Sequence, residues 1–246
     1  MKFIEYNFSI NLKEKNIIGI DEAGVGDYFG PLCSAAVLIP YQNVNKVVAL
    51  GVKDSKKLTD KAVREIAEKL KSSGLIMYSI HHLTPKGYNS LNKKYNANVL
   101  KMFTHLNSFT NLEKKLTSYD YVFIDQYANK TSIEKYYEEL IYANNWAKLT
   151  EINSEILLAH NAESVCPSVA AASVLARAEF LSLMDEMNEK YHIEFPFGSS
   201  KKVKEFAKKF FDKHNNDPNL INEVCKSSFK MKINDDDTGC YKLFSD

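Results

Sequence analysis

Two adjacent carboxylates, Asp21 and Glu22, have the residue types and the spacing that could support catalysis. They follow the apolar run 17–20 and precede the glycine-rich turn 23–31. Two acids at the mouth of a buried strand are unfavourable unless a positive group compensates them. Mg²⁺ and similar hard ions take oxygen ligands, usually one or two carboxylates together with waters and substrate phosphates. The pair therefore indicates a metal-dependent phosphodiester site, with a solvated strand-end turn as the alternative.

Two further acids lie where the same site could use them. Asp125 ends the apolar run 121–124, at the C-terminal edge of an expected strand, where α/β sheets bind ligands. Taken alone, such an Asp is more often solvated. Glu163 stands just before Pro167, which fits the first position of a helix, and the helix dipole there favours an anion. Together the four acids could hold two metal ions about 3.5–4 Å apart.

Two segments are suited to contact a sugar-phosphate backbone. Gly24 and Gly26 lack Cβ atoms, so backbone groups there can approach a ligand closely. A bare G-x-G is weak evidence, and the sequence has no G-x-x-x-x-G-K-[ST] phosphate loop. The segment 52–58 places cations and a hydroxyl in a turn before a helix, among them Lys53, Ser55 and Lys56. This composition suits phosphate oxygens, although a charge cluster of this kind is usually solvated surface.

The elements that must position these residues alternate between strands and helices. Short apolar runs predict strands at 17–20, 33–39, 75–83 and 121–124. Helical spacing predicts helices at 61–71, 98–115, 133–142, 169–190 and 203–213. This pattern indicates an α/β architecture with a central sheet flanked by helices. We expect a single domain over 1–246, with 1–16 as a short N-terminal extension and about 195–246 as a helical C-terminal part and tail.

The composition restricts the classes of function. A chain of 246 residues, 45% hydrophobic and 12% aromatic, can bury a full core. Its 32 basic and 31 acidic side chains give a net charge of +1, which excludes a globally basic nucleic-acid binder and leaves local clusters. No apolar run reaches the roughly 18 residues of a membrane span, and no signal-peptide pattern opens the chain. We expect a cytoplasmic protein with no membrane contact and no organic cofactor.

Four motifs in this order resemble the type 2 ribonucleases H. They are IGIDEAGVGDYFGP (18–31), GVKDSKK (51–57), IDQY (124–127), and Ala162-Glu163 followed by AAASVLAR (170–177). The resemblance implies a ribonuclease H-like fold with a mixed sheet, and hydrolysis of the RNA strand of RNA–DNA hybrids with two Mg²⁺ or Mn²⁺ ions. It implies that metal binding and catalysis belong to Asp21, Glu22, Asp125 and Glu163. It also implies backbone contacts to ribose 2′-hydroxyls at Gly24, Val25 and Gly26, and phosphate contacts at Lys53, Ser55 and Lys56.

Within this group the sequence is more similar to bacterial ribonuclease HIII than to ribonuclease HII. Glu163 stands where HII enzymes carry Asp, Val25 replaces the basic residue of their G-R-G, and Ser199 replaces a tyrosine that recognises the junction nucleotide. Two features depart from HIII enzymes. Only about sixteen residues precede the first expected strand, where a substrate-binding domain with a TATA-binding-protein-like fold is typical, and Phe197 stands where Lys is usual.

Two alternatives stay open beside an HIII-like enzyme. One is an HII-type enzyme that incises DNA at single embedded ribonucleotides. The other is a hybrid-binding protein without catalytic activity. We expect an RNA–DNA hybrid duplex as the partner, and we expect the protein to be a monomer.

Overall fold

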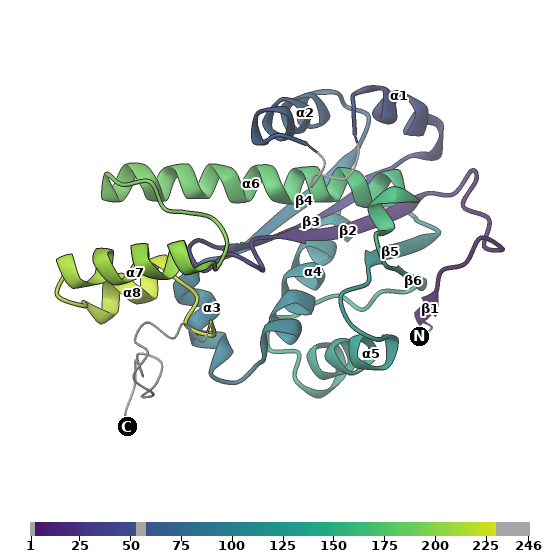
Figure 1. The fold of residues 1–246 in the computed structure, drawn as a ribbon. Coiled ribbons are helices and arrows are strands. Elements are labelled where there is room, and N and C mark those ends of the chain that lie inside the picture. Colours follow the sequence, from purple (N-terminus) through teal and green to yellow (C-terminus); the bar gives the residue numbers. More distant parts are fainter. Residues whose placement is uncertain (1–2, 53–57, 230–246) are drawn as a thin grey trace.

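A six-stranded sheet lies between layers of helices in the computed structural model, which describes residues 3–52 and 58–229 (Figure 1). The strands are β1 (Phe3–Glu5), β2 (Ile17–Ala23), β3 (Leu32–Ile39), β4 (Met77–Leu83), β5 (Tyr121–Asp125) and β6 (Glu155–Ala159). The α-helices are α1 (Val44–Ala49), α2 (Asp60–Ser72), α3 (Pro85–Asn92), α4 (Ala97–Glu113), α5 (Lys130–Glu138), α6 (Pro167–Tyr191), α7 (Lys201–Lys213) and α8 (Pro218–Val224). Short turns of other helix types are η1 (Tyr41–Asn43), η3 (Glu139–Ala143) and η4 (Ala162–Ser164).

The sheet is mixed, with the strand order β1-β6-β5-β2-β3-β4. Strands β1, β6, β5 and β2 pair in parallel, whereas β3 is antiparallel to both β2 and β4. Helices α1, α2 and α6 cover one face, and α4 and α5 cover the other (Figure 1). The predicted α/β architecture, a central mixed sheet flanked by helices, is confirmed.

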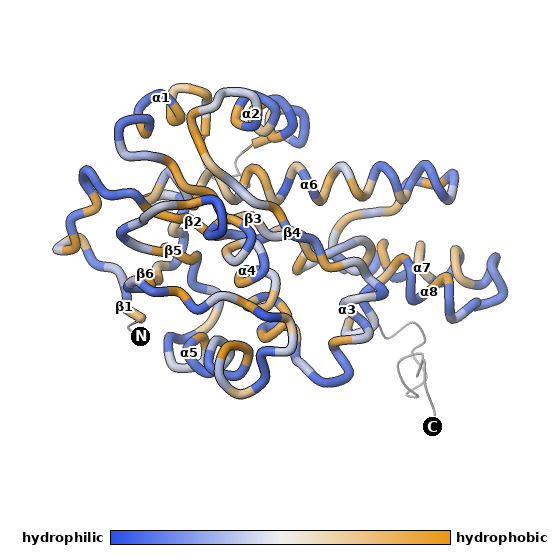
Figure 2. The backbone as a smooth tube through the Cα atoms, turned by 180° about the vertical axis from the view of Figure 1, so that it is seen from behind, coloured by the Kyte–Doolittle hydropathy of each residue, from blue (hydrophilic) through white to orange (hydrophobic). Residues whose placement is uncertain are grey.

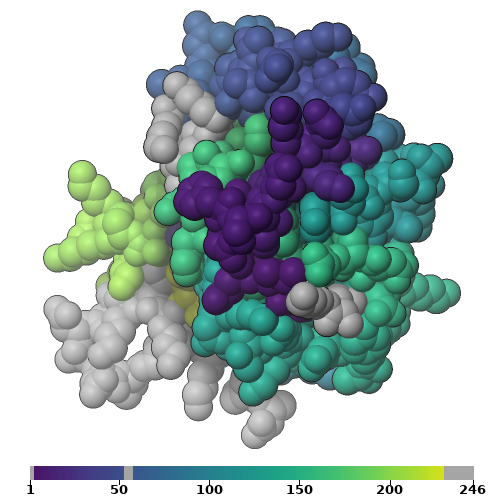
Figure 3. Space-filling view, turned by 90° about the vertical axis from the view of Figure 1, so that its right-hand side faces the viewer, coloured from purple at the N-terminus to yellow at the C-terminus, as the bar shows by residue number. Residues whose placement is uncertain are grey.

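Two strands that complete this sheet are not predicted by the sequence. β1 has only three residues and lies in the segment expected to be an extension, yet it pairs with β6 at the edge of the sheet. β6 reads EILLA, and Glu, Leu and Ala are common in helices, so composition gives little strand signal there. The N-terminal segment that contains β1 runs over one side of the molecule, coloured purple in Figure 3. Its residues Ile4, Tyr6, Ile10 and Leu12 pack against a small apolar cluster that includes Phe123.

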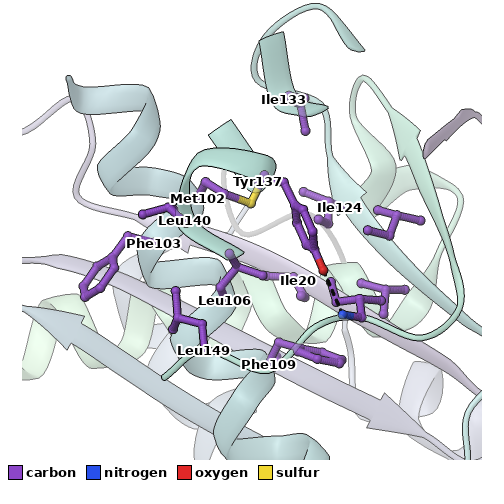
Figure 4. Packing of buried hydrophobic residues seen from close by; sticks show 14 of the residues in the cluster. Ile20, Met102, Phe103, Leu106, Phe109, Ile124, Ile133, Tyr137, Leu140 and Leu149 are labelled. Atoms are coloured by element: carbon purple, nitrogen blue, oxygen red, sulfur yellow. Dashed lines mark hydrogen bonds between the residues drawn. The ribbon is translucent and has the colours of Figure 1, made fainter. Parts of the chain in front are cut away.

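The side chains of β2 alternate between the two faces, as in any strand. Ile18 and Ile20 enter the core beneath α4, where Figure 4 shows Ile20 near Leu106 and Phe109. Gly19 faces α6 instead, and a Cβ atom built there would lie 2.1 Å from the backbone nitrogen of Val169. Helix α6 therefore packs directly against the backbone of β2. Figure 2 shows the matching pattern, with hydrophobic central strands and a hydrophilic far end of α6.

The C-terminal helices pack against the second half of α6 and against the glycine-rich loop 24–31. An aromatic cluster joins them, including Phe29, Phe195, Phe210 and Phe211. Phe29 also forms an isolated antiparallel bridge with Cys225. The buried Lys226 donates from Nζ to the carbonyl oxygens of Gly30 at 2.6 Å and Pro31 at 3.3 Å. Residues far apart in the chain thus fix the end of the loop that follows Asp21 and Glu22.

Candidate active site

Two of the four predicted acids stand at the same edge of the sheet. The parallel pairing of β2 with β5 ends at Ile20 and Ile124, so the next residue of each strand is an acid, Asp21 or Asp125. β2 itself continues to Ala23 through its pairing with β3. Asp21, Glu22, Asp125 and the loop 24–26 line a cavity of about 410 Å³. The structure therefore brings three of the predicted acids to one cavity.

Asp21 faces α6 and is almost fully buried. Its carboxylate interacts with the side chain of Ser173 in α6, and its Oδ1 accepts from the backbone N–H of Glu22 at 2.8 Å. Burial raises the pKa of Asp21 well above its ordinary value, and the negative charges of Glu22 and Asp125 raise it further. A cation near this carboxylate would relieve both effects.

Glu22 points to the opposite face of the sheet and contacts α4. Its Oε1 lies 2.9 Å from Lys101 Nζ, and its Oε2 lies 2.7 Å from His105 Nε2. Burial alone would raise the pKa of this carboxyl group, but the hydrogen bond from His105 and the charge of Lys101 lower it to about 2. Glu22 is therefore ionised and held at both oxygens.

Asp125 and Glu163 are linked through the turn η4. The backbone N–H of Ala162 donates to Asp125 Oδ1 at 2.8 Å, which fixes η4 beside the end of β5. Asn161 enters η4 in a left-handed conformation, with φ of 54°, a region that Asn tolerates well. Glu163 is buried within this turn, one residue after Ala162. It is not among the described side chains that line the cavity.

The donor set suits a hard divalent ion in its chemistry. All four candidate ligands are carboxylates, and Asp21 is desolvated beside other negative charges. As the side chains stand, no three Asp, Glu, His or Cys groups within 3–52 and 58–229 are gathered closely enough to hold an ion. The alternation along β2 explains part of this separation, since Asp21 and Glu22 face opposite sides of the sheet. The assignment of the four acids as metal ligands stays a prediction.

Two glycines of the glycine-rich loop have different roles: Gly24 is required by the backbone conformation, and Gly26 leaves open space beside the cavity. Gly24 has φ of +89°, and a Cβ there would lie 2.3 Å from the carbonyl oxygen of Pro31, so the backbone itself requires glycine. Gly26 lines the cavity, and a Cβ there would meet no atom of the described residues within 4 Å. Val25 lines the same cavity and packs partly against the core beneath α4. Open space beside Gly26 is compatible with the predicted ribose contacts, which stay predictions.

The predicted phosphate contacts Lys53, Ser55 and Lys56 lie outside the described residues. The segment that follows them does reach the cavity, since Leu58 and Asp60 are part of its lining. Thr59 accepts a hydrogen bond from the N–H of Ala62 at 3.2 Å and so caps α2, as its position before the predicted helix suggests.

The side chains of Arg177, Lys101 and His105 also belong to the site and are not among the predicted site residues. Arg177 of α6 lines the cavity, and its Nη2 lies 3.1 Å from Asp60 Oδ1. The guanidinium carbon of Arg177 lies 5.0 Å from the ring centroid of Phe197. Lys101 and His105 bind Glu22 from α4. Their spacing of four residues in the predicted helix 98–115 places both on one helix face. This spacing is the feature of the sequence from which a shared contact of the two residues could be predicted. The sequence does not identify which strand residue that face would meet.

The mixed sheet, its strand order and the acids at adjoining strand ends define the ribonuclease H-like fold. The sequence profile described as ribonuclease HII matches residues 18–232, so the chain belongs to the ribonuclease HII family. No helix in the described part of the chain is long and apolar enough to cross a membrane.

Relatives within this family are named ribonuclease HIII. The protein of Protochlamydia amoebophila is 34% identical over 214 residues, which cover 87% of this chain and 66% of the relative. The protein of Chlamydia muridarum is 32% identical over 232 residues, covering 92% of this chain and 72% of the relative. The crystal structure of Bst-RNase HIII in complex with Mn²⁺ is similar with a TM-score of 0.77 and 28% identity, covering 88% of this chain and 67% of that chain. The chain spans 59% to 66% of three of the curated relatives it matches, less than two thirds of their length.

Proposed function

We propose that this chain is a metal-dependent endonuclease that hydrolyses the RNA strand of RNA–DNA hybrids and resembles ribonuclease HIII in specificity. The observation that carries the proposal is the placement of Asp21, Glu22 and Asp125 around one cavity with the loop 24–26. Membership of the ribonuclease HII family and relatives named ribonuclease HIII support the same activity. The Mn²⁺ bound to Bst-RNase HIII supports a requirement for a divalent ion.

The four carboxylates are the proposed ligands of two Mg²⁺ or Mn²⁺ ions. When bound, such ions activate water and stabilise the leaving oxygen of a phosphodiester. Asp21 and Asp125 approach the cavity from adjacent strand ends, and Ser173 and the N–H of Ala162 orient them. Glu22 and Glu163 complete the proposed donor set from the α4 face and from η4.

The loop 24–26 is the proposed element that distinguishes RNA from DNA. A ribose 2′-hydroxyl can both donate and accept hydrogen bonds, which deoxyribose cannot. Backbone groups at Gly26 are open to a ligand, because no atom of residues 3–52 and 58–229 occupies the space where a side chain would stand. Each backbone contact contributes on the order of 1 kcal/mol, so several riboses in succession would be needed. This requirement favours hybrids and longer RNA tracts over a single ribonucleotide.

Cleavage of a matched set of duplexes tests the proposal. The set contains an all-RNA/DNA hybrid, four ribonucleotides within DNA, and one ribonucleotide within DNA, each with Mg²⁺ and with Mn²⁺. We expect efficient cutting of the first two and weak or absent cutting of the third, and Asp21→Asn serves as the inactive control. Equal rates for one and four ribonucleotides would favour the HII alternative. Binding without cleavage under every condition would favour a non-catalytic hybrid-binding protein.

Three further expectations about the protein stay predictions. These are the monomeric state, the cytoplasmic location, and the phosphate contacts of Lys53, Ser55 and Lys56. A salt series tests the last one, since log affinity falls with log salt by about 0.9 for each phosphate neutralised on duplex DNA.

A further inference from the structure

Helix α4 places two hydrogen-bond donors against Glu22, on the face of the sheet opposite α6. Lys101 and His105 are four residues apart in this helix, so their side chains project from the same side. Lys101 Nζ lies 2.9 Å from Glu22 Oε1, and His105 Nε2 lies 2.7 Å from Glu22 Oε2. An ionised carboxylate only accepts hydrogen bonds, so both nitrogens donate. Each oxygen of Glu22 therefore has its own donor.

These donors are shielded from solvent. The side chain of Lys101 is 10% exposed and that of His105 is fully buried. Tyr127, two residues beyond Asp125, covers both: its ring centroid lies 4.3 Å from Lys101 Nζ, and the ring packs edge-on against His105 at 5.7 Å. Neither donor is exposed enough to grip a duplex directly. Their effect must therefore pass through Glu22.

A buried ammonium group and an incoming divalent ion compete for the same carboxylate. The charge of Lys101 already offsets that of Glu22 across a short distance in a region of low dielectric, where charge interactions are strong. An ion that used Glu22 as a ligand would be repelled by this ammonium or would have to share the carboxylate with it. Asp21 and Asp125 have no comparable constraint from α4, because Asp21 faces α6 and Asp125 is held by a neutral backbone N–H.

We propose that Lys101 and His105 are positioning residues for Glu22, and that Lys101 is a resident counter-cation that sets the divalent-ion concentration at which the metal centre fills. The proposal rests on the proposed function, because it takes Glu22 as a metal ligand. Loss of a residue that orients a metal ligand by a hydrogen bond typically lowers metal affinity or activity by about 10–100-fold. Removal of a repelling charge acts on metal affinity in the opposite direction, so Lys101 should affect kcat and ion affinity with opposite signs.

The test combines ion binding with kinetics for Lys101→Met, with Lys101→Arg as the matched variant that keeps the charge. Calorimetric titration with Mn²⁺ should give a dissociation constant about tenfold lower for Lys101→Met than for wild type, since the repelling charge is gone. Lys101→Arg should stay within about twofold of wild type. At saturating Mn²⁺, Lys101→Met should lower kcat by about tenfold without changing KM for the hybrid. His105→Gln, which keeps a donor, should retain more of kcat than His105→Ala.

Equal or weaker Mn²⁺ binding by a folded Lys101→Met protein would overturn the counter-cation role, and an unchanged kcat would overturn the positioning role. If Lys101→Met does not fold, Glu22→Gln is compared with the double variant Glu22→Gln/Lys101→Met, which replaces the buried ion pair by neutral groups. The double variant should bind Mn²⁺ more tightly, and equal affinities would overturn the proposal. If wild-type protein binds Mn²⁺ but cuts no hybrid, the proposed function is contradicted. The counter-cation role of Lys101 is still tested in that case, because the comparison of Mn²⁺ affinities does not depend on cleavage.

Discussion

Asp21 and Glu22 are neighbours in the chain but occupy opposite electrostatic environments. Burial and nearby acids raise the pKa of Asp21, whereas His105 and Lys101 outweigh burial and lower the pKa of Glu22 to about 2. The sequence predicts both acids and the strand that carries them. It does not predict this division, the opposite pKa shifts of the two acids. The contacts that lower the pKa of Glu22 come from α4, and His105 lies 83 residues beyond Glu22 in the chain.

This division predicts opposite effects of two neutralising substitutions on the metal-free protein. A carboxyl whose pKa is raised on folding costs stability when ionised, and this cost grows as pH rises from its unfolded pKa through its folded one. Asp21→Asn should therefore raise the melting temperature at neutral pH. Glu22 contributes stability that is complete above its unfolded pKa of about 4.5 and is lost as pH falls through about 2. Glu22→Gln should therefore lower the free energy of unfolding by about 3 kcal/mol.

Thermal melts at neutral pH with a chelator measure both variants against wild type. The difference between wild type and Glu22→Gln should shrink as the pH is lowered from 4.5 towards 2. Shifts of the same sign for both variants at neutral pH would contradict the assigned environments.

At the scale of elements, the contact between β2 and α6 determines where Asp21 and Ser173 meet. Gly19 is the residue that permits this contact, since a Cβ there would overlap backbone atoms of both Ser168 and Val169. The sequence predicts the strand and the long helix from their apolar patterns. It does not show that Gly19 faces the helix, because glycine has no side chain that contributes to a periodic pattern. The sequence does not predict strand β6 for a different reason, because its composition, EILLA, favours a helix.

Gly19→Ala should destabilise the protein, because backbone atoms must move to accommodate the new methyl group. Overpacking at a site of this kind costs about 3 kcal/mol. Gly26→Ala is the matched control, since its Cβ would meet no atom within 4 Å in the part of the chain that the structure describes, and its φ is not positive. The control should change the free energy of unfolding by less than about 0.5 kcal/mol. Urea unfolding of the two variants makes the comparison, and equal stabilities would show that α6 does not depend on Gly19.

At the scale of the whole molecule, the candidate site joins segments that are distant in sequence. The loop after Glu22 is fixed by Lys226, which donates to the carbonyls of Gly30 and Pro31, and by Asp27, whose Oδ1 accepts from the N–H of Gly198 at 2.6 Å. Burial lowers the pKa of Lys226 to about 8. The sequence predicts helices in the C-terminal part. It does not predict that this part holds the glycine-rich loop, because a single lysine such as Lys226 has no distinguishing pattern in the sequence.

The accumulation of acids at one edge of the sheet predicts that divalent ions stabilise the whole fold. An ion that binds only the folded protein adds RT ln(1 + [L]/Kd) to the free energy of unfolding, about 2.7 kcal/mol at one hundred times Kd. For a chain of 246 residues, this corresponds to a rise in melting temperature of roughly 5–10 °C. Mn²⁺ should therefore raise the melting temperature in a concentration-dependent way, and Asp21→Asn/Asp125→Asn should abolish the rise. If wild-type protein melts at the same temperature with and without saturating Mn²⁺, these acids do not bind the ion in the folded state. If the double variant responds as wild type does, the stabilising ion binds elsewhere on the molecule.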